Sequence, residues 1–145
     1  MEIRQAQLHE ASAVVMLAQA LWPHHTTNEL REELLPLLQR DDAAFFLAYH
    51  HECPVGYAQC QLRRDYVEGC SSSPVGYLEG LYVAPAFRGQ GIARALLAQC
   101  EKWAKSCGCA EFASDCELDN TDSLSFHLKS GFTEAGRIIC FCKML

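Results

Sequence analysis

The segment LEGLYVAPAFRGQGIARALL, residues 78–97, decides the fold and places an acid just ahead of a loop. Its first part is apolar except for Glu79 and is typical of a buried strand. A loop with Arg88, Gly89 and Gly91 follows, and the residues after Gly91 have the apolar spacing of an amphipathic helix. A strand, a glycine-bearing loop and a helix in this order predict an anion site at the start of the helix.

The anion expected at this loop is a phosphate or pyrophosphate. The first N–H groups of the helix lack intrahelical partners, Gly89 and Gly91 carry no Cβ, and Arg88 adds a permanent positive charge. A dinucleotide fingerprint is disfavoured because Arg94 replaces the third glycine and the strand ends too far before Gly89. A plain strand-to-helix connection, with Arg88 in solvent, is the alternative.

Length and charge narrow the class of protein. The 145 residues, half of them apolar, predict a single domain spanning residues 1–145. Neither a run of 18 apolar residues nor a signal-peptide pattern is present, so we expect a cytoplasmic protein that does not bind membranes. The net charge of −6 argues against nucleic acid as a partner and permits a cationic one.

The nine cysteines do not form a metal-binding or disulfide pattern. Cys60, Cys100, Cys140 and Cys142 lie in apolar runs, where a thiol behaves as a small hydrophobic group. Neither the cysteines nor the two His-His pairs have the spacing of a zinc site. We therefore expect reduced, inert thiols and no metal.

Hydrophobic periodicity predicts an α/β (α+β) chain whose mixed central sheet is flanked by helices on both faces. Thr26 and Glu29 match a capping box, Pro36 should kink or shorten its helix, and Gly131 should end the last helix. Strands are expected at residues 1–5, 43–49, 55–62, 75–83, 110–114 and 132–144, and helices at 11–22, 26–38, 92–107 and 121–129.

Two carboxylates, Glu79 and Asp115, are the candidate functional acids of the predicted strands and loops. A charged Glu79 in an apolar strand is costly unless paired or used, and alternation places it on one face with the other odd-numbered residues of 75–83. Gly80 predicts a β-bulge or a close backbone approach. Asp115, after the next strand, is a second acid, and the two together suit the ammonium groups of a cation. The alternatives are a solvent-facing Glu79 and an Asp115 that caps a turn.

The loop also carries a family resemblance. Arg88, Gly91 and Ala93, after a Val-x-Pro strand end, resemble the acetyl-CoA motif of the GCN5-related N-acetyltransferases (GNAT), and Asn120 with Ser130-Gly131-Phe132 resembles their second signature. The chain is similar over nearly its whole length to the aminoglycoside 6'-N-acetyltransferases of that family. The segments that carry this similarity are 21–23, 64–67, 69–70, 72–74, 78–80 and 113–115.

The resemblance implies a GNAT fold, whose mixed central sheet is mostly antiparallel. It also implies an enzyme and a homodimer in contact through its C-terminal strands. Such an enzyme transfers acetyl directly from acetyl-CoA, without a metal, to the 6'-amino group of an aminoglycoside and so confers antibiotic resistance. The implied cofactor-binding residues are Leu81, Tyr82, Val83, Arg88, Gly89, Gln90, Gly91, Ile92, Ala93, Arg94 and Asn120. The implied substrate-binding residues are Trp22, Tyr66, Glu79 and Asp115, and His25 is added for its closeness to Trp22.

The chemistry assigns roles to some of these residues. An alkyl ammonium, with a pKa near ~10, must lose a proton before it attacks, and Glu79 and Asp115 are the catalytic candidates for that step. The N–H of Val83 occupies the family's position for stabilising the oxyanion. His127 stands where the family often has a tyrosine acid, which leaves the general acid open. Gly136 stands where relatives can carry an acid, with Glu134 two residues away.

Several alternatives stay open at this point. Trp22 and Tyr66 either contact substrate or pack in the core, and Asn120 caps a helix, contacts the cofactor, or does both. The acceptor is either an aminoglycoside or another cationic amine, such as a polyamine or a protein N-terminus. A non-catalytic acyl-CoA-binding module is the remaining hypothesis.

Overall fold

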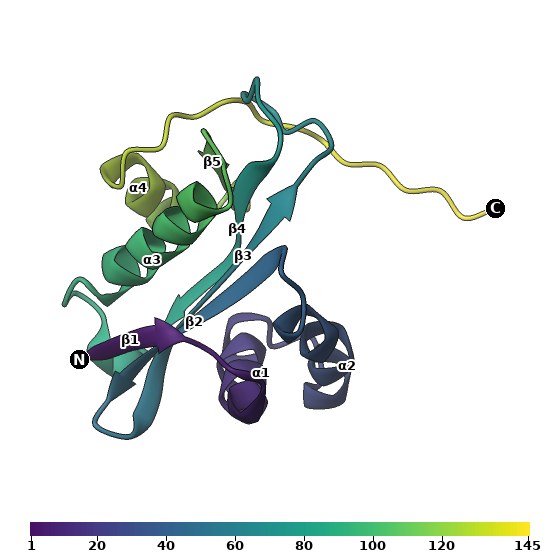
Figure 1. The fold of residues 1–145 in the computed structure, drawn as a ribbon. Coiled ribbons are helices and arrows are strands. Elements are labelled where there is room, and N and C mark those ends of the chain that lie inside the picture. The colour runs from purple at the N-terminus through teal and green to yellow at the C-terminus, as the bar shows by residue number, and fades with distance from the viewer.

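The computed structural model describes all 145 residues and contains one five-stranded sheet (Figure 1). The strands lie in the order β1-β2-β3-β4-β5, antiparallel except for the parallel pair β4-β5. Their bounds are β1 (Glu2–Gln5), β2 (Ala43–His50), β3 (Cys53–Arg63), β4 (Val75–Val83) and β5 (Phe112–Ala113). The predicted mixed, mostly antiparallel sheet is confirmed.

Helices cover both faces of the sheet, as predicted (Figure 1). They are α1 (Ala11–Leu21), α2 (Thr27–Leu38), α3 (Ile92–Ser106) and α4 (Thr121–Lys129), with short 3-10 helices η1 (Leu8–Glu10) and η2 (Pro85–Phe87). One core forms where α1 and α2 pack on the sheet around Phe45 and Tyr57. The other forms under α3 around Phe46 and Leu96. None of the helices combines the length and apolarity needed to cross a membrane.

The predicted helix ends are present. Thr26 Oγ1 accepts the N–H of Glu29 at 3.1 Å and so caps α2. Pro36 does not shorten α2, because the helix continues past it to Leu38, the last residue expected for this helix. Gly131 follows α4 with a φ of 96°, a left-handed conformation that favours glycine.

β4 changes face at Glu79. Gln59 pairs with Gly80 and Cys60 with Leu78, which leaves Glu79 as an extra residue in a β-bulge, as predicted. The prediction that all odd-numbered residues of β4 share one face is wrong, because a one-residue bulge shifts the alternation. Val83 packs in the core under α3, whereas Glu79 lies with Arg63 on the face that α1 covers.

β4 and β5 diverge soon after they meet. Their parallel pairing joins only Gly76 with Phe112 and Tyr77 with Ala113. The strand predicted at 110–114 is therefore reduced to two residues. Beyond Tyr77, the edge of β4 that faces β5 has no neighbouring strand, and its backbone groups are open to a ligand.

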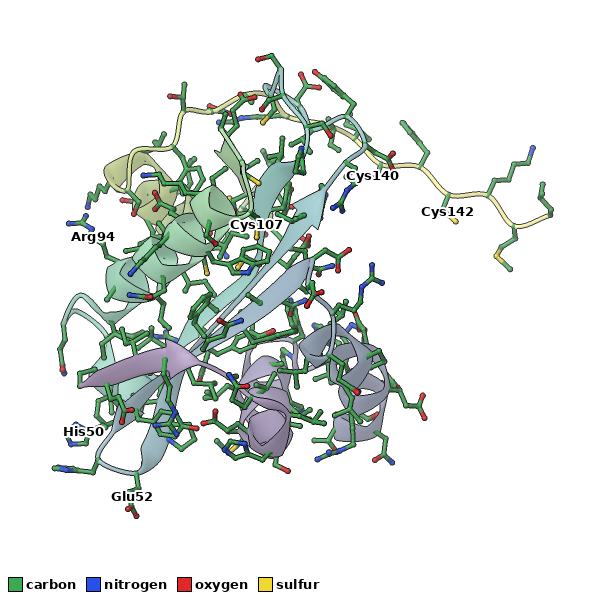
Figure 2. All side chains as sticks on the ribbon, viewed as in Figure 1. His50, Glu52, Arg94, Cys107, Cys140 and Cys142 are labelled. Carbon is green, nitrogen blue, oxygen red and sulfur yellow. The ribbon has the colours of Figure 1, made fainter.

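The strand predicted at 132–144 is wrong, because residues 132–145 contain no regular element and run away from the sheet (Figure 1). A strand needs a neighbour for its backbone hydrogen bonds, and this segment has none within the chain. Ile138, Ile139 and Phe141 are 80–90% exposed. Cys140 and Cys142 are exposed too (Figure 2), against the expectation from their apolar run, whereas Cys60 and Cys100 are buried.

Candidate active site

Glu79 lies in a bidentate ion pair. Arg63, the last residue of β3, donates from Nε to Oε1 at 3.0 Å and from Nη2 to Oε2 at 2.9 Å. The Glu79 side chain is only 19% exposed. Burial raises the pKa of Glu79; Arg63 opposes that shift and the Asp115 charge adds to it. The result is a carboxylate with a basicity above that of an ordinary surface glutamate.

Tyr77 connects this ion pair to the second carboxylate. The guanidinium carbon of Arg63 lies 3.4 Å from the centroid of the Tyr77 ring, and the Tyr77 hydroxyl donates to Oδ2 of Asp115. Burial and that hydrogen bond raise the pKa of Tyr77, so the phenol stays protonated and remains a donor. Arg63, Tyr77, Glu79 and Asp115 thus form one connected group, named the acid cluster below.

Trp22, the residue after α1, packs against the strand beside Glu79. A Cβ placed on Gly80 would lie 2.7 Å from Cη2 of Trp22, so this close approach requires glycine. The indole also meets Tyr57 edge-on, with ring centroids 6.3 Å apart. Trp22 is half-buried, so it belongs to the core and borders the acid cluster at once.

His25 and Tyr66 have no contact with the acid cluster. His25 Nδ1 lies 3.2 Å from Oε2 of Glu29, in the first turn of α2. Tyr66 is 77% exposed, and its hydroxyl lies 3.4 Å from Oε2 of Glu68. Two of the five predicted substrate residues therefore stand apart from the other three.

The two acids considered near the C-terminus also lie outside the acid cluster. Glu134 pairs with Arg137 within its own segment. A Cβ on Gly136 would lie 3.5 Å from Cγ of Glu68, so a side chain at that position would meet the loop before β4. No acidic side chain of residues 132–145 pairs with the residues around Glu79.

The backbone at the far end of β4 is aimed at the open edge. The N–H of Ala84 donates to the carbonyl of Val55 at 2.8 Å, and hydrogen bonds of an antiparallel ladder alternate along the strand. The N–H groups of Val83 and Leu81 therefore point away from β3, while Tyr82 points toward it. An extended ligand arm can pair with Leu81 and Val83 without disturbing the sheet.

The loop after β4 needs its two glycines for backbone geometry. Gly89 and Gly91 have φ values of 79° and 82°, while a Cβ on either would meet nothing within 4 Å. Gly91 caps α3, and its carbonyl accepts the N–H of Ala95 at 3.0 Å. The N–H groups of residues 92–94 precede the first intrahelical donor and are left for an anion.

The side chains around this loop have separate tasks. Arg88 Nε donates to the carbonyl of Val83 at 2.7 Å, which ties the loop to the end of β4, while Arg88 itself remains exposed. Ile92 is buried in the core under α3, next to the half-buried Ala93, and anchors the helix start. Gln90 is exposed, and Arg94 Nη2 reaches the carbonyl of Lys129 at 3.4 Å (Figure 2).

Asn120 and His127 belong to α4. Asn120 caps the helix, because its Oδ1 accepts the N–H of Ser123 at 3.1 Å. His127 Nδ1 lies 2.7 Å from the carbonyl of Ser123, which only accepts, so Nδ1 carries a proton. Nε2 lies 2.8 Å from the hydroxyl of Ser114, so the two groups form a hydrogen bond in which either can donate.

Arg63, Tyr77 and Ser114 are the functional candidates that sequence reasoning missed. Tyr77 stands two residues before Glu79, and Arg63 directly precedes the segment 64–67 that carries the family resemblance. The strand register, which pairs Arg63 with Val75, is what brings Arg63 close to Tyr77 and Glu79. That register depends on the bulge at Glu79, which the strand pattern alone does not position.

The chain forms no metal site, and two cavities lie away from the acid cluster. No group of three or more His, Cys, Asp or Glu side chains lies close enough to hold a metal ion. Two cavities, of about 110 and 220 Å³, lie beside Phe112 and Glu101, between α3 and the outer side of β5. They are lined by neither carboxylate of the acid cluster.

Comparisons with known proteins agree with this geometry. Residues 11–132 match the model of the acetyltransferase (GNAT) family. Aminoglycoside N(6')-acetyltransferase type 1 of Salmonella typhimurium strain LT2 is 38% identical over 143 residues, 99% of each chain. The protein of that name from Stenotrophomonas maltophilia is 41% identical over 140 residues, 96% of this chain and 90% of its own.

A solved structure extends the similarity to three dimensions. AAC(6')-Iy in complex with the bisubstrate analog CoA-S-monomethyl-acetylneamine superimposes with a TM-score of 0.94 at 38% identity. The match covers 99% of this chain and 98% of that one. The similarity therefore includes the sheet, the loop after β4 and the segments that carry Glu79 and Asp115.

Proposed function

The chain belongs to the acetyltransferase (GNAT) family, and on this premise we propose that it is an aminoglycoside 6'-N-acetyltransferase. It transfers acetyl from acetyl-CoA directly to the 6'-amino group of aminoglycosides and so confers resistance to these antibiotics. The observation that carries the proposal is the acid cluster at the bulge of β4, next to the open edge of the same strand. Cation-binding carboxylates and an anion-binding loop there share one strand.

The cofactor end of β4 holds the acyl donor. Acetyl-CoA supplies the activated acetyl group when bound. The N–H groups of residues 92–94 hold its pyrophosphate, with Arg88 to Arg94 around them, and Leu81 and Val83 pair with its extended arm. Asn120, already a helix cap, has an amide N–H₂ left to donate near the thiol end. The N–H of Val83 stabilises negative charge that develops on the acetyl oxygen.

The acceptor end of β4 holds the amine. Glu79 and Asp115 bind ammonium groups, and Trp22 supplies an aromatic edge beside them. Glu79 accepts the proton that the 6'-ammonium must lose, and its raised pKa improves it as a base. His25 and Tyr66, which stand apart from the acid cluster, would contact the substrate from outside it. No group of the protein is acylated, because the amine attacks the donor directly.

An acceptor panel tests this function. With acetyl-CoA, we expect CoASH release that depends on tobramycin and on other aminoglycosides with a 6'-amine, but not on one with a 6'-hydroxyl group. Spermidine and a peptide with a free N-terminus test the other amine acceptors. An enzyme active only on these would contradict the aminoglycoside assignment, and tight acetyl-CoA binding without turnover would indicate a binding module.

We further propose that the protein works in the cytoplasm as a homodimer of single-domain subunits, without nucleic-acid or membrane partners. Residues 137–145 would cross to the second copy and extend its sheet beside β5. The exposed Ile138, Ile139 and Phe141 support this, as does the cavity pair beside that edge. Light scattering should give twice the chain mass for the full chain and the monomer mass after deletion of 137–145; an unchanged mass would contradict it.

A further inference from the structure

The guanidinium of Arg63 occupies the place in the acid cluster where a substrate cation would bind. It uses one nitrogen for each carboxylate oxygen of Glu79 and covers the ring of Tyr77. The geometry points to Arg63 as a resident counter-ion of the acceptor site, which the ammonium group of the substrate displaces from Glu79. This inference rests on the proposed function and adds to it the residue that selects the substrate's charge pattern.

Displacement is required because Glu79 is too enclosed to serve two cations. Its side chain is 19% exposed, and both of its oxygens already accept from Arg63. An ammonium that arrives while Arg63 stays in place would meet a neutralised carboxylate and a neighbouring positive charge. Arg63 also stabilises the charged form of Glu79, so opening the ion pair makes the carboxylate a better acceptor for the proton of the amine.

Arg63 is free to leave. Its side chain is 43% exposed, and its polar and ring contacts are confined to Glu79 and Tyr77. Rotation into solvent therefore breaks one ion pair and one stacking contact, and leaves the sheet intact. The incoming ammonium restores the pairing of Glu79, so the half-buried carboxylate is never left uncompensated.

The exchange selects for substrates with several charges. A single ammonium has to outcompete a bidentate guanidinium that is already tethered to the protein, and a tethered group has the advantage of high effective concentration. A polycation that engages Glu79 and Asp115 together gains a second contact that Arg63 does not make. Arg63 thus disfavours small monoamines and diamines while polycationic sugars still bind.

Arg64 offers a matched control for the charge itself. Its guanidinium lies 3.8 Å from Asp42 and has no contact with Glu79. Arg63→Met and Arg64→Met each remove one positive charge from neighbouring positions, so any general attraction of a cationic ligand changes equally in both. A difference between the two variants reports the contact with Glu79.

The first measurement follows Arg63 directly, by ¹H–¹⁵N spectra of the Nε–H groups in the full chain saturated with CoA. Tobramycin should shift or broaden the Arg63 signal, which Arg63→Met identifies, as the side chain moves into solvent. The Nε–H of Arg40, bonded to Asp42 at 2.8 Å, is the internal control and should not move. An unmoved Arg63 signal at saturating tobramycin would overturn the inference and leave the proposed function standing.

The second measurement is calorimetry of the same CoA complex. We expect Arg63→Met to bind tobramycin about threefold to tenfold more tightly than Arg64→Met, and to bind the diamine putrescine with a larger relative gain. Equal affinities, or weaker binding by Arg63→Met, would overturn the inference and make Arg63 a support for Glu79. A wild-type protein that binds no aminoglycoside would contradict the proposed function as well, so the two failures are distinguishable.

Discussion

The two ends of β4 present different chemical groups to a ligand. The cofactor end uses backbone: the N–H groups of Leu81 and Val83, two glycines with positive φ, and the start of α3. The acceptor end uses charged side chains drawn from β3, β4 and the segment after β5. A backbone site recognises a feature common to many acyl donors, whereas a side-chain site can be altered residue by residue. Donor binding and acceptor choice can therefore vary independently on one strand.

The largest expected effect is at the acceptor end. Glu79→Gln keeps the size of the side chain but removes the group proposed to take the amine proton. We expect kcat/KM for tobramycin to fall by about 10²- to 10⁴-fold, measured by CoASH release. Glu52→Gln, in the exposed turn between β2 and β3, is the control and should stay near the wild-type rate. Wild-type kinetics from Glu79→Gln would remove this carboxylate from the reaction.

A smaller effect is expected at the cofactor end, from Gly91→Ala. Alanine at a φ of 82° costs about 1–2 kcal/mol and disturbs the N–H groups that start α3. We expect KM for acetyl-CoA to rise roughly fivefold to tenfold, with little change in KM for tobramycin. Gly108→Ala has the same kind of strain, at a φ of 88° after α3, away from the loop. If both variants raise KM for acetyl-CoA equally, strain alone explains the loss.

The smallest effect is a shift in pH dependence. The raised pKa of Glu79 means that its base form appears only at higher pH, so the acid limb of kcat/KM should lie above the ordinary glutamate value. Asp115→Asn removes a charge that adds to this shift, while Arg63, which opposes it, remains. The limb should then move to lower pH. An acid limb that stays at the wild-type pH, or moves to higher pH, would show that the charge of Asp115 does not raise the pKa of Glu79.

The sequence predicted the cofactor end better than the acceptor end for a physical reason. Strand, loop and helix of the cofactor end are contiguous in residues 78–97, so local spacing describes them. The acceptor end depends on which residue of β3 faces Glu79, and the bulge changes that register. Gly80 predicted the bulge but not its effect on the alternation, so Arg63 and Tyr77 were missed.

The C-terminal segment shows a second limit of sequence patterns. The apolar run around Ile138 and Phe141 satisfies the pattern of a strand, yet it forms none in this chain. A strand pattern indicates that a segment can form β-sheet hydrogen bonds, but it does not indicate which strand will be its neighbour. By contrast, the helix at Thr121–Lys129 was predicted to the residue, because a cap and a glycine stop are local signals.

The central claim, that β4 divides into a donor end and an acceptor end at Glu79, is tested most directly by calorimetry on Glu79→Gln. CoA is titrated into the variant first, and tobramycin is then titrated into the CoA complex. The account predicts wild-type affinity for CoA and clearly weaker binding of tobramycin. Loss of CoA binding, or tobramycin binding equal to that of the wild-type complex, would contradict it.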